Sequence, residues 1–166
     1  GVGWDSYSIA ERLSNWVSFL YLKNFQTNEV TNETLKIRIF RQALYLMQNL
    51  EFRGPATNNH IINNGRALYL VGLYLNNGTF QQTGREILLA SIDLMFTHSG
   101  FLREGSSHYH ILLTRSYLEV LIYSQRYKDH EFGKLLNKRV EKIWKAACFF
   151  LEAQPFPVFG DVSPDF

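Results

Sequence analysis

The sequence predicts an all-α fold in which six helices are joined by short connections. Apolar residues recur with helical spacing along nearly all of the 166 residues, and no β-branched alternation is long enough to indicate a strand. Turn-forming residues interrupt this pattern at Gly54-Pro55, Asn76-Asn77-Gly78, Ser99-Gly100 and Pro155. Short connections make consecutive helices antiparallel neighbours. The helices are expected at about residues 5–24, 31–51, 58–76, 81–97, 106–127 and 133–153.

The first three helices are expected to alternate between inner and outer positions. The first helix is mainly apolar, with Ile9, Leu13, Trp16, Val17, Leu20 and Leu22. The second is amphipathic, which is typical of a helix with one face in solvent. The third is apolar on nearly all sides from Leu68 to Leu75, interrupted only by Gly72. A helix of that kind must be covered on every side.

The last three helices continue the alternation. The fourth is closer to the outer kind, and the fifth, from Ile111 to Ile122, is again apolar almost all round. The sixth has an apolar stripe formed by Leu136, Val140, Ile143, Ala147 and Phe150, opposite a charged face formed by Lys138, Glu141, Lys142 and Lys145. Alternating inner and outer helices without a strict repeat favour an arc of an (α/α) toroid over a regular repeat array.

Composition excludes several classes of protein. Seventeen basic and 15 acidic residues give a net charge of +2, so neither nucleic acid nor a membrane surface is indicated as a partner. Polar residues interrupt every apolar run before it reaches the length of a membrane span. Cys148 is the only cysteine, which excludes an internal disulfide and predicts a buried thiol. The chain begins without a signal peptide and ends in a loop, which we interpret as a piece of a larger protein.

The predicted topology gathers polar residues at one rim. If the first, third and fifth helices are all inner, their N-termini emerge on the same side, together with the loop 154–166. The candidates for one cleft are then Trp4, Asp5, Tyr7, Asn58-Asn59-His60, residues 104–110 and Asp161. Helix N-termini favour bound carboxylates.

Two of these clusters have both a structural and a functional interpretation. In Asn58-Asn59-His60, spacing alone favours an asparagine N-cap. In residues 104–110, Ser106 or Ser107 is an adequate cap, and the cluster of His108, Tyr109 and His110 beside Glu104 supports both interpretations equally. Arg12, within an apolar helix, needs a partner or a water-lined cavity, and spacing favours a core position for Trp16.

Other chemistries find little support. His108 and His110 lack the i, i+4 spacing of two metal ligands on one helix face. Neither a glycine-rich phosphate loop nor a serine nucleophile elbow occurs. Asp5, Glu104, Asp161 and Asp165 are carboxylates of the kind that a glycoside hydrolase uses in pairs, but their spacing selects no pair.

Four segments of the chain carry a resemblance to known proteins. They are residues 11–16, residues 58–68 with Asn59-His60, residues 100–110 with Ser106-Ser107-His108-Tyr109-His110, and residues 159–161. In this order they resemble the heparinase II/III-like and alginate-lyase superfamily of polysaccharide lyases.

The resemblance implies a bacterial enzyme that cleaves a uronate-containing, acidic polysaccharide by β-elimination, without a metal or other cofactor. It implies an N-terminal (α/α) toroid followed by a β-sandwich, and a periplasmic or secreted location. Residues 1–166 are then a partial toroid domain that lacks the β-sandwich, and we expect such an arc to dimerise or to be marginally stable. This sequence departs from the family pattern in two ways. Ser-Ser-His precedes Tyr109, where relatives often have Ser-Pro, and the toroid is incomplete.

The resemblance also implies roles for individual residues. The catalytic residues implied in this way are Asn59, His60 and Tyr109. From the chemistry of their side chains, we also expect substrate-binding residues at Arg12, Trp16, Asn58, Glu104 and His110, of which Glu104 and His110 suit a supporting role better than direct chemistry. Asn59 would bind the uronate carboxylate, and either His60 or Tyr109 would be the base. Two alternatives stay open: an (α/α)-barrel glycoside hydrolase with paired carboxylates, and a non-catalytic glycan-binding domain.

Overall fold

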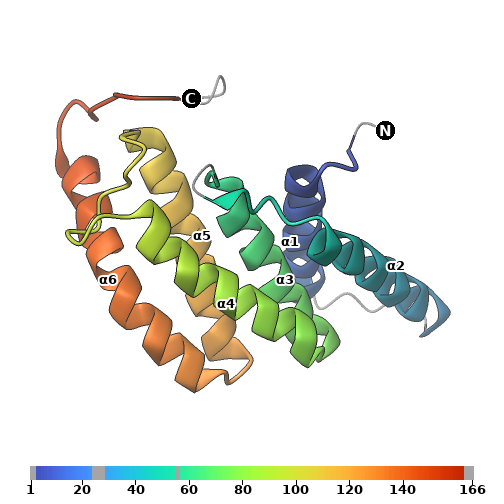
Figure 1. The fold of residues 1–166 in the computed structure, drawn as a ribbon. Helices are drawn as coiled ribbons and strands as arrows, with labels where there is room; N and C mark the ends of the chain where they lie inside the picture. Colours follow the sequence, from blue (N-terminus) through green and yellow to red (C-terminus); the bar gives the residue numbers. More distant parts are fainter. Residues whose placement is uncertain (1–2, 24–28, 55–56, 163–166) are drawn as a thin grey trace. The chain divides into compact units, whose positions relative to one another are not determined.

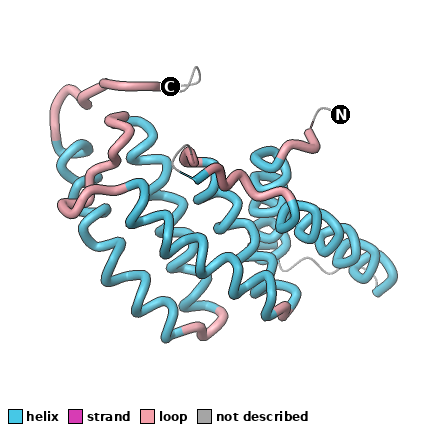
Figure 2. Tube along the Cα trace, viewed as in Figure 1, coloured by secondary structure: helices cyan, strands magenta, loops and turns pink. Residues whose placement is uncertain are grey.

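The structure is a computed structural model that describes residues 3–23, 29–54 and 57–162. Its regular secondary structure is α-helical, and the described residues add one isolated β-bridge between Phe96 and Leu102. Figures 1 and 2 show the helices α1 (Ser6–Lys23), α2 (Glu29–Gln48), α3 (His60–Leu75), α4 (Gly78–Met95), α5 (Ser107–Arg126) and α6 (His130–Glu152). The predicted helices are therefore confirmed. They fall into two compact units, residues 1–88 and 89–166.

The turn between α3 and α4 is shorter than predicted. Asn76 ends α3 in the left-handed conformation, with φ of 52°, and its N–H donates to the Gly72 carbonyl. Asn77 Oδ1 then accepts a hydrogen bond from Phe80 N at 3.0 Å, which caps α4. Because one asparagine closes α3 and the next opens α4, α4 begins at Gly78 and not near residue 81.

The start of α6 is also earlier than predicted. Lys128 has a φ of 60°, and the Asp129 carbonyl accepts a hydrogen bond from Gly133 N at 3.0 Å. This bond already has the spacing of an α-helix. The helix therefore begins at His130, whereas the apolar stripe that predicted it becomes visible only from residue 133.

Helix α3 is the core of the first unit. Every residue from Ile61 to Leu73 is buried, which confirms the prediction of a helix covered on all sides. Close contact with α4 depends on two glycines. A methyl group added at Gly72 would overlap the Gln81 backbone, and one added at Gly84 would lie 2.5 Å from Tyr69 N. A larger residue at either position would push the two helices apart.

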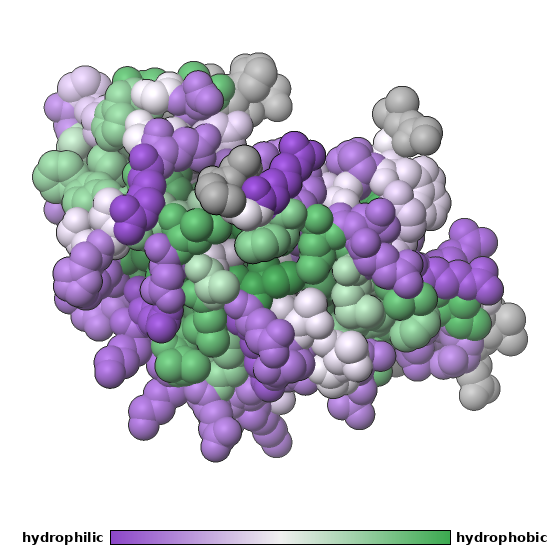
Figure 3. Space-filling model, viewed as in Figure 1, coloured by the Kyte–Doolittle hydropathy of each residue, from purple (hydrophilic) through white to green (hydrophobic). Residues whose placement is uncertain are grey.

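In the second unit α5 packs against α6. The buried side of α6 contains Phe132, Leu136, Val140, Ile143, Ala146, Ala147 and Phe150, as its apolar stripe predicts. The predicted charged face is exposed, and Figure 3 shows hydrophilic side chains along this part of the molecule. Helix α5 is less covered than expected, because Ile122 is 50% exposed and Arg115 is also exposed.

Two smaller expectations concern Cys148 and membrane insertion. Cys148 is half-buried and free. Its predicted fully buried position is therefore wrong in degree, because it lies at the edge of the apolar stripe of α6.

Among the described residues, no helix combines the length and the apolarity that crossing a membrane requires.

Candidate active site

His60 is the first residue of α3, and a carboxylate holds its ring. Its Nδ1 lies 2.9 Å from Glu51 Oε1, and the side chain is 39% exposed. The ring packs against Tyr7 of α1, with a centroid separation of 4.7 Å. The N-terminal ends of α1 and α3 therefore lie together, as the predicted rim requires within this unit.

Glu51 is itself fixed by a buried amide. Asn64 Nδ2 donates to Glu51 Oε2 at 3.2 Å, and Glu51 N donates to Asn64 Oδ1 at 3.0 Å. Asn64 is fully buried. Neither residue was predicted to belong to the site. The available signal was Asn64 itself, because an asparagine inside an apolar helix needs a hydrogen-bonding partner.

The asparagines before His60 divide the capping role differently from the prediction. Asn59 occupies the N-cap position, but its side chain makes no capping hydrogen bond. Asn58 Oδ1 instead accepts from His60 N at 3.1 Å. Since Asn58 performs this local task, the half-buried Asn59 amide is not committed to the helix start.

Arg12 and Trp16 lie one turn apart on α1. Arg12 Nε donates to Gln42 Oε1 at 2.7 Å, and Arg12 Nη1 donates to the Gly3 carbonyl at 3.1 Å. These are the partners that a half-buried arginine was predicted to need. Trp16 is also half-buried, so its indole is neither wholly in the core nor wholly exposed.

The start of α5 carries Tyr109 in the second unit. Ser106 is the N-cap, and its Oγ accepts from Tyr109 N at 3.0 Å. Tyr109 is half-buried, and its ring meets His108 edge to face at 5.6 Å. Glu104 lies exposed in the loop before the cap.

The segment after α6 returns to this same end of α5. The Ser106 hydroxyl donates to the Asp161 carbonyl, and Ser107 N donates to the Phe159 carbonyl at 3.2 Å. The two segments approach closely at Gly160, where a Cβ would overlap the Gly105 carbonyl. The predicted arrival of this segment at the N-terminus of α5 is confirmed.

His110 lies inside the second unit. It is 0% exposed, its Nδ1 accepts from Leu102 N at 3.3 Å, and its Nε2 donates to the Ile143 carbonyl at 3.2 Å. Burial lowers the pKa of this imidazole, and the hydrogen bond to Ile143 opposes that effect. Because the His110 side chain has no exposed surface, its position fits the supporting role better than direct contact with a substrate.

The structure thus assembles two partial sites. The first unit joins His60, Glu51 and Tyr7, and the second joins Tyr109, Ser106 and the Asp161 backbone. That both contribute to one cleft stays a prediction. In the described parts of the chain, no group of three or more His, Cys, Asp or Glu residues could hold a metal ion.

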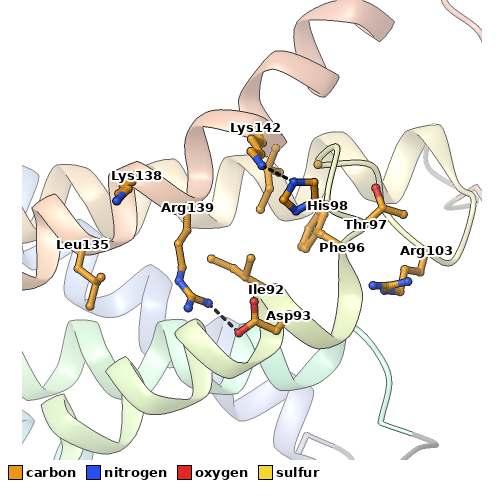
Figure 4. A pocket seen from close by; sticks show the side chains of 12 residues that line it. Ile92, Asp93, Phe96, Thr97, His98, Arg103, Leu135, Lys138, Arg139 and Lys142 are labelled. Atoms are coloured by element: carbon orange, nitrogen blue, oxygen red, sulfur yellow. Dashed lines mark hydrogen bonds and ion pairs between the residues drawn. The ribbon is translucent and has the colours of Figure 1, made fainter.

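The second unit also contains a cavity of about 570 Å³. It lies between the end of α4, the loop that follows, and α6 (Figure 4). Arg103, Lys138, Arg139 and Lys142 contribute cationic side chains, and Asp93 is the one carboxylate in its lining. None of these residues belongs to the predicted active site.

Comparisons with known proteins complete this description. Residues 1–165 match the family model described as the heparinase II/III N-terminus. The fold is similar to a solved heparinase III with methylated lysines, at a TM-score of 0.70 and 16% identity over 89% of this chain and 23% of that one. It is also similar to the heparan sulfate lyase HepC from Pedobacter heparinus, at a TM-score of 0.71 and 19% identity over 93% and 25% of the two chains.

This chain therefore spans about a quarter of each similar structure or less. No curated protein sequence matches it. The structural likeness confirms the predicted fold class, an all-α part of an (α/α) toroid built from antiparallel helical hairpins. Because the family model matches nearly the whole sequence, the chain belongs to the heparinase II/III family, whose N-terminal region it represents.

Proposed function

We propose that the protein containing this chain is a lyase that cleaves a uronate-containing polysaccharide by β-elimination. The observation that carries this proposal is the start of α3. There, in a chain of the heparinase II/III family, a carboxylate holds His60 beside an Asn59 side chain that does not cap the helix. The substrate class is supported by the similar structures, which are a heparinase III and a heparan sulfate lyase.

Asn59 is the group proposed to bind the uronate carboxylate. The C5 proton of a uronate is weakly acidic while the neighbouring carboxylate is charged, so elimination needs a donor that stabilises the developing enolate. The Asn59 amide can donate such a hydrogen bond, and the N-terminus of α3 adds a favourable dipole. Asn58 and Arg12 are proposed to assist in binding, and Trp16 to contact a neighbouring sugar ring.

Two groups are proposed to move the protons. His60 or Tyr109 removes the C5 proton, and the electrons of the broken C5–H bond pass into the enolate of the bound carboxylate. As the C4–O bond breaks, this electron pair forms the C4=C5 double bond and the electrons of the C4–O bond leave with the glycosidic oxygen, which takes a proton from the proposed donor Tyr109. His110 is proposed to hold the first turn of α5 in place through its hydrogen bonds with Leu102 N and the Ile143 carbonyl, and Glu104 is proposed to contact the chain of sugars at the surface.

The same proposal includes the wider context of the chain. The substrate is an acidic polysaccharide, and the proposed location is periplasmic or secreted. A β-sandwich domain elsewhere in the protein and a homodimer are also part of this proposal. We propose that the reaction uses no cofactor.

The experiment uses the full-length protein with heparan sulfate, hyaluronan, chondroitin and alginate as substrates. Elimination creates a conjugated double bond, so ultraviolet absorbance should rise with one or more substrates. Tyr109→Phe should lower the rate by roughly 100-fold to 10,000-fold. The matched control is Tyr74→Phe, which changes a half-buried tyrosine at the far end of α3 and should leave the rate unchanged.

Other results would point elsewhere. New reducing ends without the absorbance, lost in Glu104→Gln and kept in Tyr109→Phe, would support a glycoside hydrolase instead. Saccharide binding without cleavage of any of the four polymers would contradict the lyase and support a glycan-binding domain.

A further inference from the structure

The environment of His60 determines which ring nitrogen carries its proton. An ionised carboxylate only accepts hydrogen bonds, so the 2.9 Å contact with Glu51 Oε1 places the hydrogen on His60 Nδ1. In the neutral imidazole the lone pair is then on Nε2. Glu51 cannot easily rotate away, because its second oxygen and its backbone N–H both bind Asn64.

We infer that Glu51 is a positioning residue that holds His60 with Nδ1 protonated and Nε2 free to accept a proton. The Tyr7 ring, 4.7 Å away and tilted by 41°, limits rotation of the imidazole on its other side. The catalytic consequence rests on the proposed lyase activity: His60 would act through Nε2 as a base or as a hydrogen-bond acceptor. The tautomer itself follows from the contacts alone.

The experiment reads the tautomer directly. Full-length protein labelled with ¹⁵N-histidine is compared with its His60→Gln variant, which identifies the His60 signals in long-range ¹H–¹⁵N spectra. In the wild-type protein the neutral ring should show a protonated Nδ1. Glu51→Gln should give a mixture of tautomers, because an amide can donate to Nδ1 as well as accept from it. A wild-type ring protonated mainly at Nε2 would overturn the inference.

Kinetics provide the second measurement. Glu51→Gln should lower kcat by about 10-fold to 100-fold, the range found when a metal-bound histidine loses the partner that orients it, with little change in KM. The control Glu86→Gln changes an exposed carboxylate on α4 and should change neither quantity. An unchanged kcat in Glu51→Gln overturns the positioning role. A wild-type protein with the expected tautomer and no activity overturns only the proposed function.

A different observation, the cavity beside α6, supports an independent inference. Lys138 and Lys142 lie one turn apart on α6, and Figure 4 shows both with Arg139 along the same wall. Arg139 Nη1 is held by Asp93 Oδ2 at 2.7 Å. Lys142 Nζ lies 3.3 Å from His98 Nε2, which fits an ammonium donating to a neutral imidazole. The four cations of the lining outnumber its carboxylate.

One end of the cavity is built by a tightly bonded loop that contacts α6. Thr97 N donates to the Phe101 carbonyl and Arg103 N to the Met95 carbonyl, each at 2.8 Å. Gly100, at φ of 94°, packs against the Lys142 carbonyl with no space for a Cβ. These bonds hold the backbone that carries Arg103 in place before any ligand binds, which lowers the entropic cost of ordering this loop on binding.

We propose that this cavity binds an anionic segment of a saccharide chain. Its volume lies in the range of small-molecule sites, and its charges suit carboxylate or sulfate groups. Leu135, 48% exposed, and the edge of Ile92 offer apolar surface for the face of a sugar ring. A single-stranded nucleic acid is less well matched, because it needs exposed aromatic rings, and Phe96 of the lining is 3% exposed.

The test measures binding of a sulfated heparin hexasaccharide to the full-length protein by calorimetry. The double variant Lys138→Ala/Lys142→Ala should bind about five- to tenfold more weakly, as expected for two lost ionic contacts. Lys134→Ala/Lys145→Ala removes the same charge from exposed positions of α6 outside this cavity and should bind normally. Equal weakening in both double variants would overturn the proposal. An oligothymidylate of the same charge that binds the wild-type protein as tightly as the hexasaccharide, or more tightly, would also overturn it.

Discussion

Arg66 and Glu11 form an ion pair that joins α3 to α1, with 2.8 Å between Arg66 Nη2 and Glu11 Oε1. The Arg66 side chain is 3% exposed, whereas that of Glu11 is 32% exposed. A guanidinium stays charged even when buried, so it depends on a neighbouring carboxylate. Both residues lie in segments that resemble polysaccharide lyases, and their ion pair stabilises the contact between α1 and α3 in the first unit.

Removing this carboxylate should destabilise the first unit. Glu11→Ala should lower the free energy of unfolding by about 2–3 kcal/mol, at or below the lower end for buried pairs because Glu11 is partly solvated. Glu33→Ala is the control, since its ion pair with Lys36 is exposed and should contribute less than about 0.5 kcal/mol. Urea unfolding measures both. Equal midpoints for the two variants would contradict the structural role of Glu11.

Close packing between α3 and α4 provides a second prediction. Gly72→Ala should destabilise the protein by about 1–3 kcal/mol, because the new methyl group would overlap the Gln81 backbone. This cost exceeds the gain of about 1 kcal/mol in helix propensity. Gly78→Ala adds the same methyl group where nothing lies within 4 Å, so it should be neutral or stabilising. Thermal unfolding distinguishes the two, and equal melting temperatures would show that the helices can separate without cost.

The cap of α5 provides a third prediction. Ser106→Ala removes the acceptor for Tyr109 N and the donor to the Asp161 carbonyl, and should cost about 1–2 kcal/mol. Amide exchange in residues 157–162 should accelerate, because this segment loses a tether to α5. Ser99→Ala, at an exposed serine that pairs with Thr97, should have neither effect. Unchanged exchange in Ser106→Ala would mean that Ser107 alone holds the segment.

A fourth prediction concerns pH. Burial lowers the pKa of His110 in the folded protein, so the unfolded state binds a proton more readily than the folded state does. The stability contributed by the neutral ring is therefore present above the unfolded pKa of about 6.5 and is lost as pH falls. Relative to His110→Gln, the wild-type protein should lose up to about 1.4 kcal/mol per pH unit below that value. Parallel stability curves from pH 7 to about pH 5 would contradict this linkage.

The helices were predictable because their signals are local. Apolar periodicity and the breakers determine α3, and Asn76-Asn77-Gly78 marks its end. Which asparagine closes α3 and which opens α4 depends on backbone angles and on one hydrogen bond to Phe80, so the start of α4 was misplaced. The exposed Ile122 shows a similar limit, since apolarity indicates that a side chain can be buried, not that a neighbour covers it.

The site was predictable only in part. His60 and Tyr109 could be predicted as site residues because a histidine and a tyrosine lie at predicted helix starts. Glu51 has no comparable signal: it follows α2 in an ordinary loop, and its role depends on the contact with His60 and on a buried Asn64 thirteen positions later. Such partners become visible only when the helices are packed.

The two hydrogen bonds of His110 have a consequence for its neighbour Tyr109. One nitrogen binds the loop at Leu102, and the other binds the α6 backbone at Ile143, 33 positions along the chain. The imidazole therefore lies between the loop before α5 and the backbone of α6, and it is hydrogen-bonded to both. The first turn of α5, which carries Tyr109 on its surface, is therefore joined to the α6 backbone through a side chain that has no exposed surface of its own.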